Sequence, residues 1–211
     1  MAGIQEVYDL VARGKAKKVG AAVTEALEAG CDPTEILNKG MIAAMDEVGA
    51  KFKSGEIFVP EMLVAAKAMK NGVEILKPHL ASGVAGAAGK VIIGTVSGDL
   101  HDIGKNLVAM MLESSGFEVI DLGVDVPKEK FVEAYEENPD TKLICCSALL
   151  TTTMNAMKET VDLLNHSSFR DKIKVMVGGA PISQDFADEI GADAYTEDAA
   201  SCAQKAKELV A

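Results

Sequence analysis

The chain has 211 residues, of which 32 are acidic and 21 basic, so its formal net charge is -11. This surplus of negative charge repels phosphate backbones and offers no counterion release, which excludes nucleic acid as an expected partner. The composition is 48% hydrophobic, with 4% aromatic residues and no Trp. A core built from Ala, Val, Leu, Ile and Met suits the packing of helices.

Neither a membrane-spanning segment nor an export signal is predicted. No apolar run approaches the roughly 18 residues of a spanning helix, and the opening sequence MAGIQEVYDL lacks a basic segment followed by an apolar one. We therefore expect a cytoplasmic protein with no membrane partner. The length favours two compact domains.

The four cysteines are expected to be free thiols. Cys145 and Cys146 are adjacent in an apolar run, while Cys31 and Cys202 lie far apart in helical contexts. No Cys/His cluster has the spacing of a zinc site, so a structural zinc is not predicted.

Residues 1–80 carry the pattern of a helical bundle, because apolar positions recur every three or four residues without the alternation of strands. Helices are expected near 3–12 and 15–29, then after the N-cap Asp32, and finally from Pro60. The last two carry apolar stripes, made of Leu37, Met41, Ala44, Met45, Val48 and Phe52 in one and of Met62, Ala66, Met69, Val73 and Leu76 in the other.

Residues 81–89, ASGVAGAAG, predict an interdomain linker, since they contain little that can anchor in a core. Beyond Lys90 a strand, a loop and a helix alternate, with strands expected near 90–96, 117–122, 142–147, 173–178 and 193–195. This alternation predicts an α/β domain with a five-stranded parallel sheet in flavodoxin-like (Rossmann-type) order. Ligands of such sheets bind at the carboxyl ends of strands 1 and 3.

The loop after strand 1 reads SGDLHDIGKN and places a histidine where this fold binds ligands. His101 follows Asp99 by two residues, so a carboxylate can hold one ring nitrogen while the other faces a metal. The residues alone leave a second interpretation open, in which Asp99 or Asp102 caps the next helix and His101 is a solvated loop residue. His79 and His166 are expected to be surface or capping residues.

Three elements of the sequence resemble the cobalamin-binding module of corrinoid proteins and of cobalamin-dependent methionine synthase. They are Asp-x-His-x-x-Gly at 99–104, Ser-x-Leu at 147–149 and Gly-Gly at 178–179, each at the end of strand 1, 3 or 4. The bundle with its run GEIFVPEMLVAAKAM resembles the helical cap of methyltransferase corrinoid proteins. The resemblance thus implies a cap domain (1–80), the linker and a cobalamin-binding domain (90–211).

The resemblance implies that His101 is the lower axial ligand of cobalt and the sole metal ligand. Asp99 would accept the proton of the other ring nitrogen, and Thr153 would join this network in place of a Ser in methionine synthase. Gly178 and Gly179 would let the backbone approach the buried nucleotide tail of cobalamin, which Ser147 would hydrogen-bond. The full set of implied cofactor-binding residues is Gly98, Asp99, Leu100, His101, Asp102, Ile103, Gly104, Ser147, Leu149, Thr151, Thr153, Gly178, Gly179 and Ala199.

The implied function is that of a methyl carrier in one-carbon metabolism, itself non-catalytic, which alternates between methylcob(III)alamin and cob(I)alamin. Its partners would be a substrate:corrinoid methyltransferase, a methylcorrinoid:acceptor methyltransferase using tetrahydrofolate or a thiol, and a reductive activation protein. Phe52, Phe58, Met62 and Met69 are candidates for the lid over the methyl group, although each also fits an ordinary bundle core. The methyl donor, whether an amine, a betaine, methanol or an aryl ether, stays open because the partner selects it.

Three alternatives share parts of this pattern. The cobalamin subunit of an adenosylcobalamin-dependent mutase has the same three motifs but lacks a helical cap. A cobalamin-based sensor adds a DNA-binding domain for which this acidic chain has no room. A flavin-binding or signalling domain leaves His101 and the Gly178-Gly179 pair unexplained.

Overall fold

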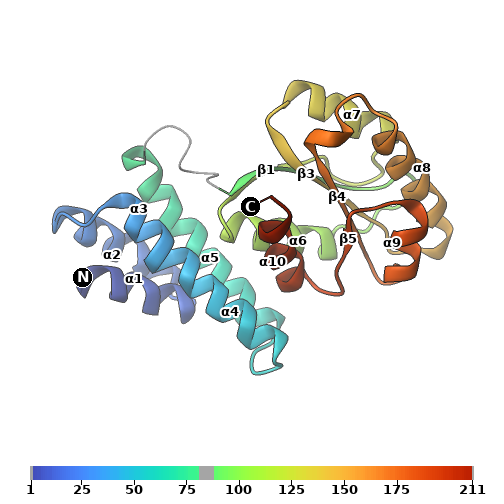
Figure 1. Ribbon diagram of the computed structural model, residues 1–211. Helices are drawn as coiled ribbons and strands as arrows, with labels where there is room; N and C mark the ends of the chain where they lie inside the picture. The colour runs from blue at the N-terminus through green and yellow to red at the C-terminus, as the bar shows by residue number, and fades with distance from the viewer. Residues whose placement is uncertain (1, 81–87, 211) are drawn as a thin grey trace. The chain divides into compact units, whose positions relative to one another are not determined.

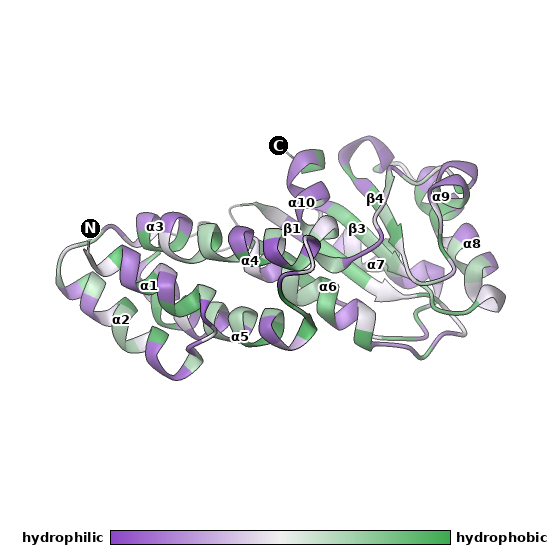
Figure 2. Cartoon of the chain, turned by 90° about the horizontal axis from the view of Figure 1, so that it is seen from below, coloured by the Kyte–Doolittle hydropathy of each residue, from purple (hydrophilic) through white to green (hydrophobic). Residues whose placement is uncertain are grey.

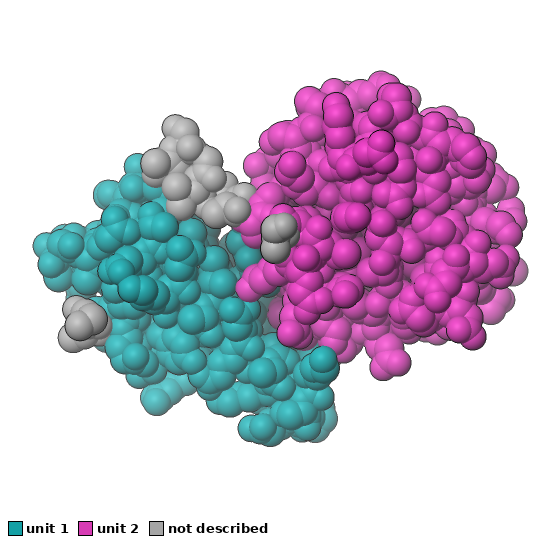
Figure 3. All heavy atoms as spheres, in the orientation of Figure 1, with its two compact units in different colours: residues 1–87, 113–116 teal, residues 88–112, 117–211 magenta. Residues whose placement is uncertain are grey.

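The computed structural model describes residues 2–80 and 88–210. These form two compact units (Figure 3): the described residues before 81 together with 113–116, and residues 88–112 with 117–210. Most of the predicted linker, residues 81–87, lies outside the described residues, and Gly89 already opens the first strand. Among the described helices, none is both long and apolar enough to cross a membrane.

The first unit is helical, as predicted. Its elements are α1 (Ala2–Ala12), α2 (Ala16–Glu28), α3 (Pro33–Glu35), a π-helical segment η1 (Ile36–Ile42), α4 (Ala43–Lys53), α5 (Val59–Leu76) and a 3-10 turn η2 (Lys77–His79). Asp32 is the predicted N-cap, because its carboxylate accepts a 3.0 Å hydrogen bond from the backbone N–H of Glu35.

The π-helical segment is a departure from the predicted regular helix. The backbone N–H of Ala43 bonds to the carbonyl of Asn38, five residues earlier, which marks the wide turn. Gly40 lies in this turn, and a Cβ there would come within 3.2 Å of Val7 on α1. The apolar stripe nevertheless keeps its inward side, since Leu37, Met41 and Val48 are all buried.

The second unit is the predicted five-stranded parallel sheet, with the order β2-β1-β3-β4-β5 (Figure 1). Its strands are β1 (Gly89–Thr95), β2 (Phe117–Asp121), β3 (Thr141–Ser147), β4 (Lys174–Gly178) and β5 (Ala194–Tyr195). Its helices and 3-10 turns are α6 (Ile103–Ser114), α7 (Lys128–Glu137), η3 (Thr151–Thr153), α8 (Met154–Asn165), η4 (Arg170–Lys172), α9 (Gln184–Ile190) and α10 (Ala199–Val210). This order confirms the flavodoxin-like topology, and each expected strand is found to within one residue at either end.

Helices cover both faces of the sheet, α6 and α10 on one side and α7, α8 and α9 on the other (Figure 1). The inner strands are therefore apolar and buried in their central residues, 91–93 in β1 and 143–146 in β3 (Figure 2). Ile92, Ile144 and Val175 face the α7–α8 side and are fully buried in one cluster with Phe131 and Met157. All four cysteines are free thiols, as expected.

Candidate functional site

The register of the sheet brings the three sequence motifs to one edge. Thr95 at the end of β1 pairs with Ser147 at the end of β3, and Ser147 pairs with Gly178 at the end of β4. The loops that carry the predicted site residues therefore leave the sheet side by side. This edge between β1 and β3 is the switch point of the topology, where the direction of the chain crossovers reverses.

Asp99 is the centre of the site, because its buried carboxylate joins both loops. Its side chain is 0% exposed. Oδ2 accepts hydrogen bonds from the backbone N–H of Leu149 at 2.7 Å and from Oγ1 of Thr153 at 2.8 Å. Oδ1 lies 2.7 Å from Nδ1 of His101 and accepts the backbone N–H of that residue at 3.1 Å. Asp99 is thus not a cap of α6, and the helix-cap alternative is wrong for this residue.

These hydrogen bonds decide the charge of Asp99. Burial by itself raises the pKa of the carboxyl group, but the bonds from Leu149, His101 and Thr153 outweigh it and hold the pKa well below its usual value. Asp99 is consequently an anion at neutral pH and can only accept hydrogen bonds. Its contact with His101 requires that Nδ1 carry the proton.

His101 presents the other ring nitrogen outward. The side chain is 49% exposed, and with a proton on Nδ1 the neutral ring keeps its lone pair on Nε2. The main chain of His101 is also held, since buried Thr95 donates its hydroxyl to the His101 carbonyl at 2.9 Å. This is the arrangement of a metal-binding imidazole whose tautomer and orientation are set by a carboxylate behind it.

The loops at this edge of the sheet also expose large apolar side chains. Leu100 is 72% exposed, Ile103 is 85% exposed and Leu149 is 43% exposed. All three come from the motifs predicted to contact the cofactor. Large apolar residues gathered at a ligand-binding edge indicate a surface that is covered when the protein works.

Local packing requires glycine at one of the two predicted positions at the end of β4 but not at the other. A Cβ at Gly179, where φ is +131°, would lie 1.8 Å from the carbonyl oxygen of Ala148, so only glycine fits there. A Cβ at Gly178 would first meet the carbonyl of Thr196, at an ordinary 3.8 Å. The requirement for glycine at position 179 is thus set by the neighbouring β3 loop, while the surroundings of Gly178 leave room for a Cβ.

The remaining predicted residues lie around this centre with fewer contacts to it. Gly98 adjoins Thr153, because a Cβ there would be 3.6 Å from the Thr153 methyl group. Asp102 accepts a 3.1 Å hydrogen bond from the amide of Asn106 in the first turn of α6, next to Gly104. Thr151 is exposed in η3, and Ala199 is buried at the start of α10; neither is brought against His101 by a hydrogen bond.

Sequence reasoning missed Thr95, Lys105 and Asp125. The Lys105 ammonium is only 2% exposed and bonds to Asp121 at 2.5 Å and to Asn106 at 2.7 Å, which ties α6 to the end of β2. Asp125 accepts a 2.7 Å hydrogen bond from the backbone N–H of Gly98. Thr95 alone had a local signal, as a hydroxyl at the end of an apolar strand.

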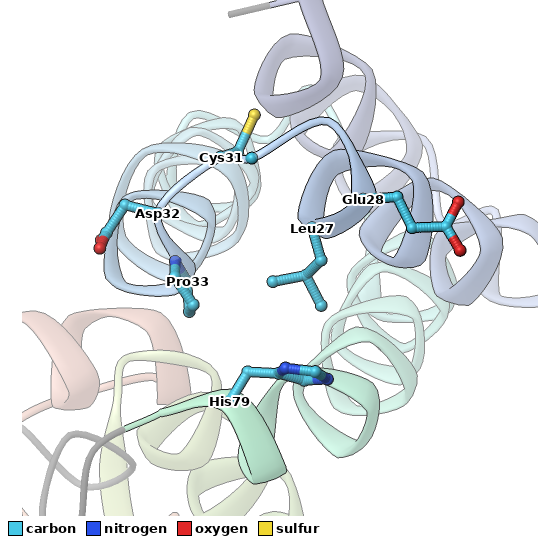
Figure 4. Close-up of a pocket in the computed structure, with 7 residues that line it drawn as sticks. Leu27, Glu28, Cys31, Asp32, Pro33 and His79 are labelled. Atoms are coloured by element: carbon cyan, nitrogen blue, oxygen red, sulfur yellow. The ribbon is translucent and has the colours of Figure 1, made fainter.

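Other sites are few in the described part of the chain. No group of three or more His, Cys, Asp or Glu side chains there is arranged to hold a metal ion. His166 is the C-cap of α8, with Nδ1 2.8 Å from the carbonyl of Asp162, and His79 is exposed. The helical unit contains a pocket of about 570 Å³ (Figure 4), and none of the predicted site residues lines it. Its lining residues are Leu27, Glu28, Gly30, Cys31, Asp32, Pro33 and His79.

A parallel sheet whose switch-point loop presents one carboxylate-held histidine fits a B12-binding protein. Two family models, each described as a B12 binding domain, match the chain, one over residues 89–203 and the other over residues 4–77. The match covers both the sheet and the helical unit. It confirms the predicted fold and the predicted class of cofactor.

Comparison with similar proteins shows to which family of B12-binding proteins the chain belongs. The chain is 47% identical over 210 residues to the dimethylamine corrinoid protein of Methanosarcina barkeri, across 99% of this chain and 97% of that protein. It is 46% identical over 185 residues to the trimethylamine corrinoid protein of the same organism, across 87% and 85%. The crystal structure of the methanol:cobalamin methyltransferase complex MtaBC from Methanosarcina barkeri aligns with a TM-score of 0.87 and 32% identity, over 99% of this chain and 80% of the matched chain. The chain belongs to the methyltransferase corrinoid proteins.

Membership of this family confirms the expected role of a corrinoid methyl carrier. It favours that role over a mutase subunit or a cobalamin-based sensor. A flavin-binding domain is likewise disfavoured, since the matching family models describe B12 binding.

Proposed function

We propose that this chain carries a methyl group from a methylated-amine:corrinoid methyltransferase to a second methyltransferase, on a cobalamin whose cobalt is held by Nε2 of His101. The observation that carries the proposal is the line from Thr153 through buried Asp99 to Nδ1 of His101, which leaves Nε2 free at the switch-point edge.

The donor set of the site fits a corrin better than a bare metal ion. A metal held by side chains alone needs several ligands, and the described residues offer no such cluster. A corrin brings its own equatorial nitrogens, so one imidazole suffices. Leu100, Ile103 and Leu149 form the apolar rim that a broad, flat macrocycle would cover. Held through His101, a bound cobalamin would supply a nucleophilic Co(I) centre that becomes Co(III) on taking up a methyl cation and returns to Co(I) when the acceptor removes that methyl group.

The protein's own residues hold and orient the cofactor. Asp99 keeps the His101 imidazole in one tautomer and one direction, and Thr153 keeps Asp99 in place. Ser147, Leu149, Thr151, Gly178, Gly179 and Ala199 are proposed to line the slot for the nucleotide tail. The surroundings of Gly178 support this assignment, because an added Cβ would meet only the Thr196 carbonyl, at an ordinary 3.8 Å, so there is room beside the backbone.

The exposures in the helical unit sort the candidate lid residues. Met62 and Met69 are buried, as bundle-core residues are, and Phe52 is half-buried. Phe58, which precedes α5, is 67% exposed. Of the four, Phe58 is therefore our candidate for shielding the methyl group.

We infer a methylated amine as the donor because the relatives named for dimethylamine and trimethylamine are 46–47% identical, against 32% for the protein of the methanol system. The partners would be an amine-specific corrinoid methyltransferase, a methyltransferase that passes the group to tetrahydrofolate or a thiol, and a reductive activation protein.

Reconstitution followed by transfer assays tests the proposal. The purified chain is loaded with hydroxocobalamin, reduced, and incubated with methyltransferases specific for dimethylamine, trimethylamine or methanol, and methylation of cobalt is followed by absorption. We expect stoichiometric cobalamin uptake and methylation from an amine. Methylation from methanol alone would contradict the donor class, and a preference for adenosylcobalamin would contradict the carrier role.

A further inference from the structure

Asp125 has a backbone conformation that non-glycine residues seldom adopt. Its φ is +52°, and it is the one non-glycine residue with positive φ in the part of the chain that the structure describes. The left-handed region strains an L-residue, so such a residue persists only where its surroundings hold it. Asp125 lies in the loop between β2 and α7, and β2 is the neighbour of β1, the strand that leads to His101.

What holds Asp125 is the His101 loop itself. The backbone N–H of Asp125 donates to the carbonyl of Asp99 at 2.9 Å, and the next N–H, of Val126, donates to the carbonyl of Thr95 at 2.9 Å. The Asp125 carboxylate accepts the backbone N–H of Gly98 at 2.7 Å. The β2–α7 loop is thus hydrogen-bonded to Thr95, Gly98 and Asp99. Gly98 itself has a positive φ of +80°.

These contacts fix the backbone from which the Asp99 side chain starts. Thr153 and Leu149 fix the far end of that side chain, at Oδ2. Because Nδ1 of His101 is held by the same carboxylate, a displacement of the Asp99 backbone would turn the imidazole and move Nε2.

We propose that Asp125 is a positioning residue for His101. Its carboxylate and its amide together clamp Gly98 and Asp99, and the strain at Asp125 is tolerated because the left-handed conformation aims both groups at that loop. This inference rests on the proposed function, since it assigns Asp125 a part in presenting Nε2 to cobalt.

Three variants in the full-length chain separate this role from a general effect of charge. Asp125→Asn keeps a carbonyl acceptor and a residue type that tolerates positive φ. Asp125→Gly tolerates the same φ but removes the acceptor. Glu129→Gln, in the first turn of α7, removes an exposed carboxylate that contacts neither Gly98 nor Asp99. Each variant is reconstituted with cobalamin, and the ratio of imidazole-bound to imidazole-free cobalt is measured by absorption and by Co(II) electron paramagnetic resonance.

We expect Asp125→Asn and Glu129→Gln to match the wild-type ratio, and Asp125→Gly to lower it about threefold to tenfold, as the loss of one hydrogen bond implies. A wild-type ratio in Asp125→Gly would overturn the inference. So would an Asn variant as impaired as the Gly variant, or an equal effect of Glu129→Gln.

Amide hydrogen exchange in the cofactor-free wild-type protein gives a check that needs no variant to fold. The Gly98 amide is expected to be protected, and exchange at the rate of an unstructured peptide would overturn the clamp. If the wild-type chain takes up no cobalamin, the proposed function fails and this inference with it. If it binds with the imidazole on cobalt while Asp125→Gly is identical to wild type, only the inference fails.

Discussion

Thr153 donates its hydroxyl to Asp99 across 2.8 Å, between two side chains separated by 54 positions in the sequence. Thr153 is 6% exposed and Asp99 is 0% exposed, so water cannot replace this bond. The hydroxyl is part of what keeps Asp99 ionised. Several properties of the protein depend on this contact.

Thr153→Val is expected to destabilise the fold by about 2 kcal/mol, because it removes a hydrogen bond to a buried charge while conserving side-chain shape. It should also lower the fraction of cobalamin bound through the imidazole. Thr153→Ser restores the donor and should recover both properties. Denaturant unfolding and absorption spectra measure them, and a Ser variant as impaired as the Val variant would show that the methyl group of Thr153 matters instead of its hydroxyl.

Asp99 makes the cofactor-free protein sensitive to acid. Its folded pKa lies well below that of the unfolded chain, about 4. The stabilisation is therefore complete above about pH 4 and is lost as pH falls toward the folded pKa, since the unfolded state binds the proton first. Urea unfolding at about pH 3 and pH 6 should show a smaller loss for Asp99→Asn than for wild type. Equal losses in both would contradict the ionisation of Asp99.

Substitution by alanine should affect stability at Gly179 and cobalamin binding at Gly178. Gly179→Ala is expected to cost roughly 3 kcal/mol or more, because its Cβ would collide with the Ala148 carbonyl and its φ is positive. Gly178→Ala should stay within about 1 kcal/mol of wild type yet weaken cobalamin binding, because it narrows the proposed slot. Gly20→Ala in α2, outside the predicted cofactor-binding set, is the matched control, because its added Cβ would meet only the Ile75 side chain at an ordinary 3.6 Å. Unchanged cobalamin affinity in Gly178→Ala would remove this residue from the slot.

Removing Asp121 from its ion pair with Lys105 should cost more stability than removing Lys105. Lys105 is 2% exposed and Asp121 is 39% exposed. Asp121→Ala leaves an ammonium buried without its anion, at an expected cost of about 3 kcal/mol. Lys105→Met leaves a carboxylate that water can reach, and it should cost no more than about 1 kcal/mol. Chemical denaturation of both variants measures this, and equal costs would mean that the pair is solvated as a whole.

The fold could be predicted from the sequence because the hydrophobic periods of strands and helices are local signals. All five strands were predicted to within a residue, and the motif around His101 follows directly from its place after β1. The partners of that motif were harder to predict. Asp125 and Asp121 reach the site from the end of β2, and only the register of the sheet brings that loop beside Gly98 and Lys105.

Local pattern does not separate two causes that favour the same residue. Gly179 is required by the approach of the Ala148 carbonyl, which no local signal reveals, and the assignment of the Gly178-Gly179 pair to the nucleotide slot stays a prediction. The π-helical segment Ile36–Ile42 was predicted as regular helix, because its apolar spacing still points inward. Neither feature alters the hydrophobic period on which a sequence-based prediction depends.

The axial ligand of the bound cobalt is the most direct test of the account. The protein is produced with nitrogen-15 histidine, loaded with unlabelled cobalamin and reduced to Co(II), and its electron paramagnetic resonance spectrum is recorded beside that of His101→Ala. Coordination by His101 predicts that the axial nitrogen splitting is a doublet in the labelled protein, a triplet in the unlabelled one, and absent or altered in the Ala variant. A triplet that survives histidine labelling, and persists in His101→Ala, would mean that the cofactor's own base stays on cobalt and would contradict the account.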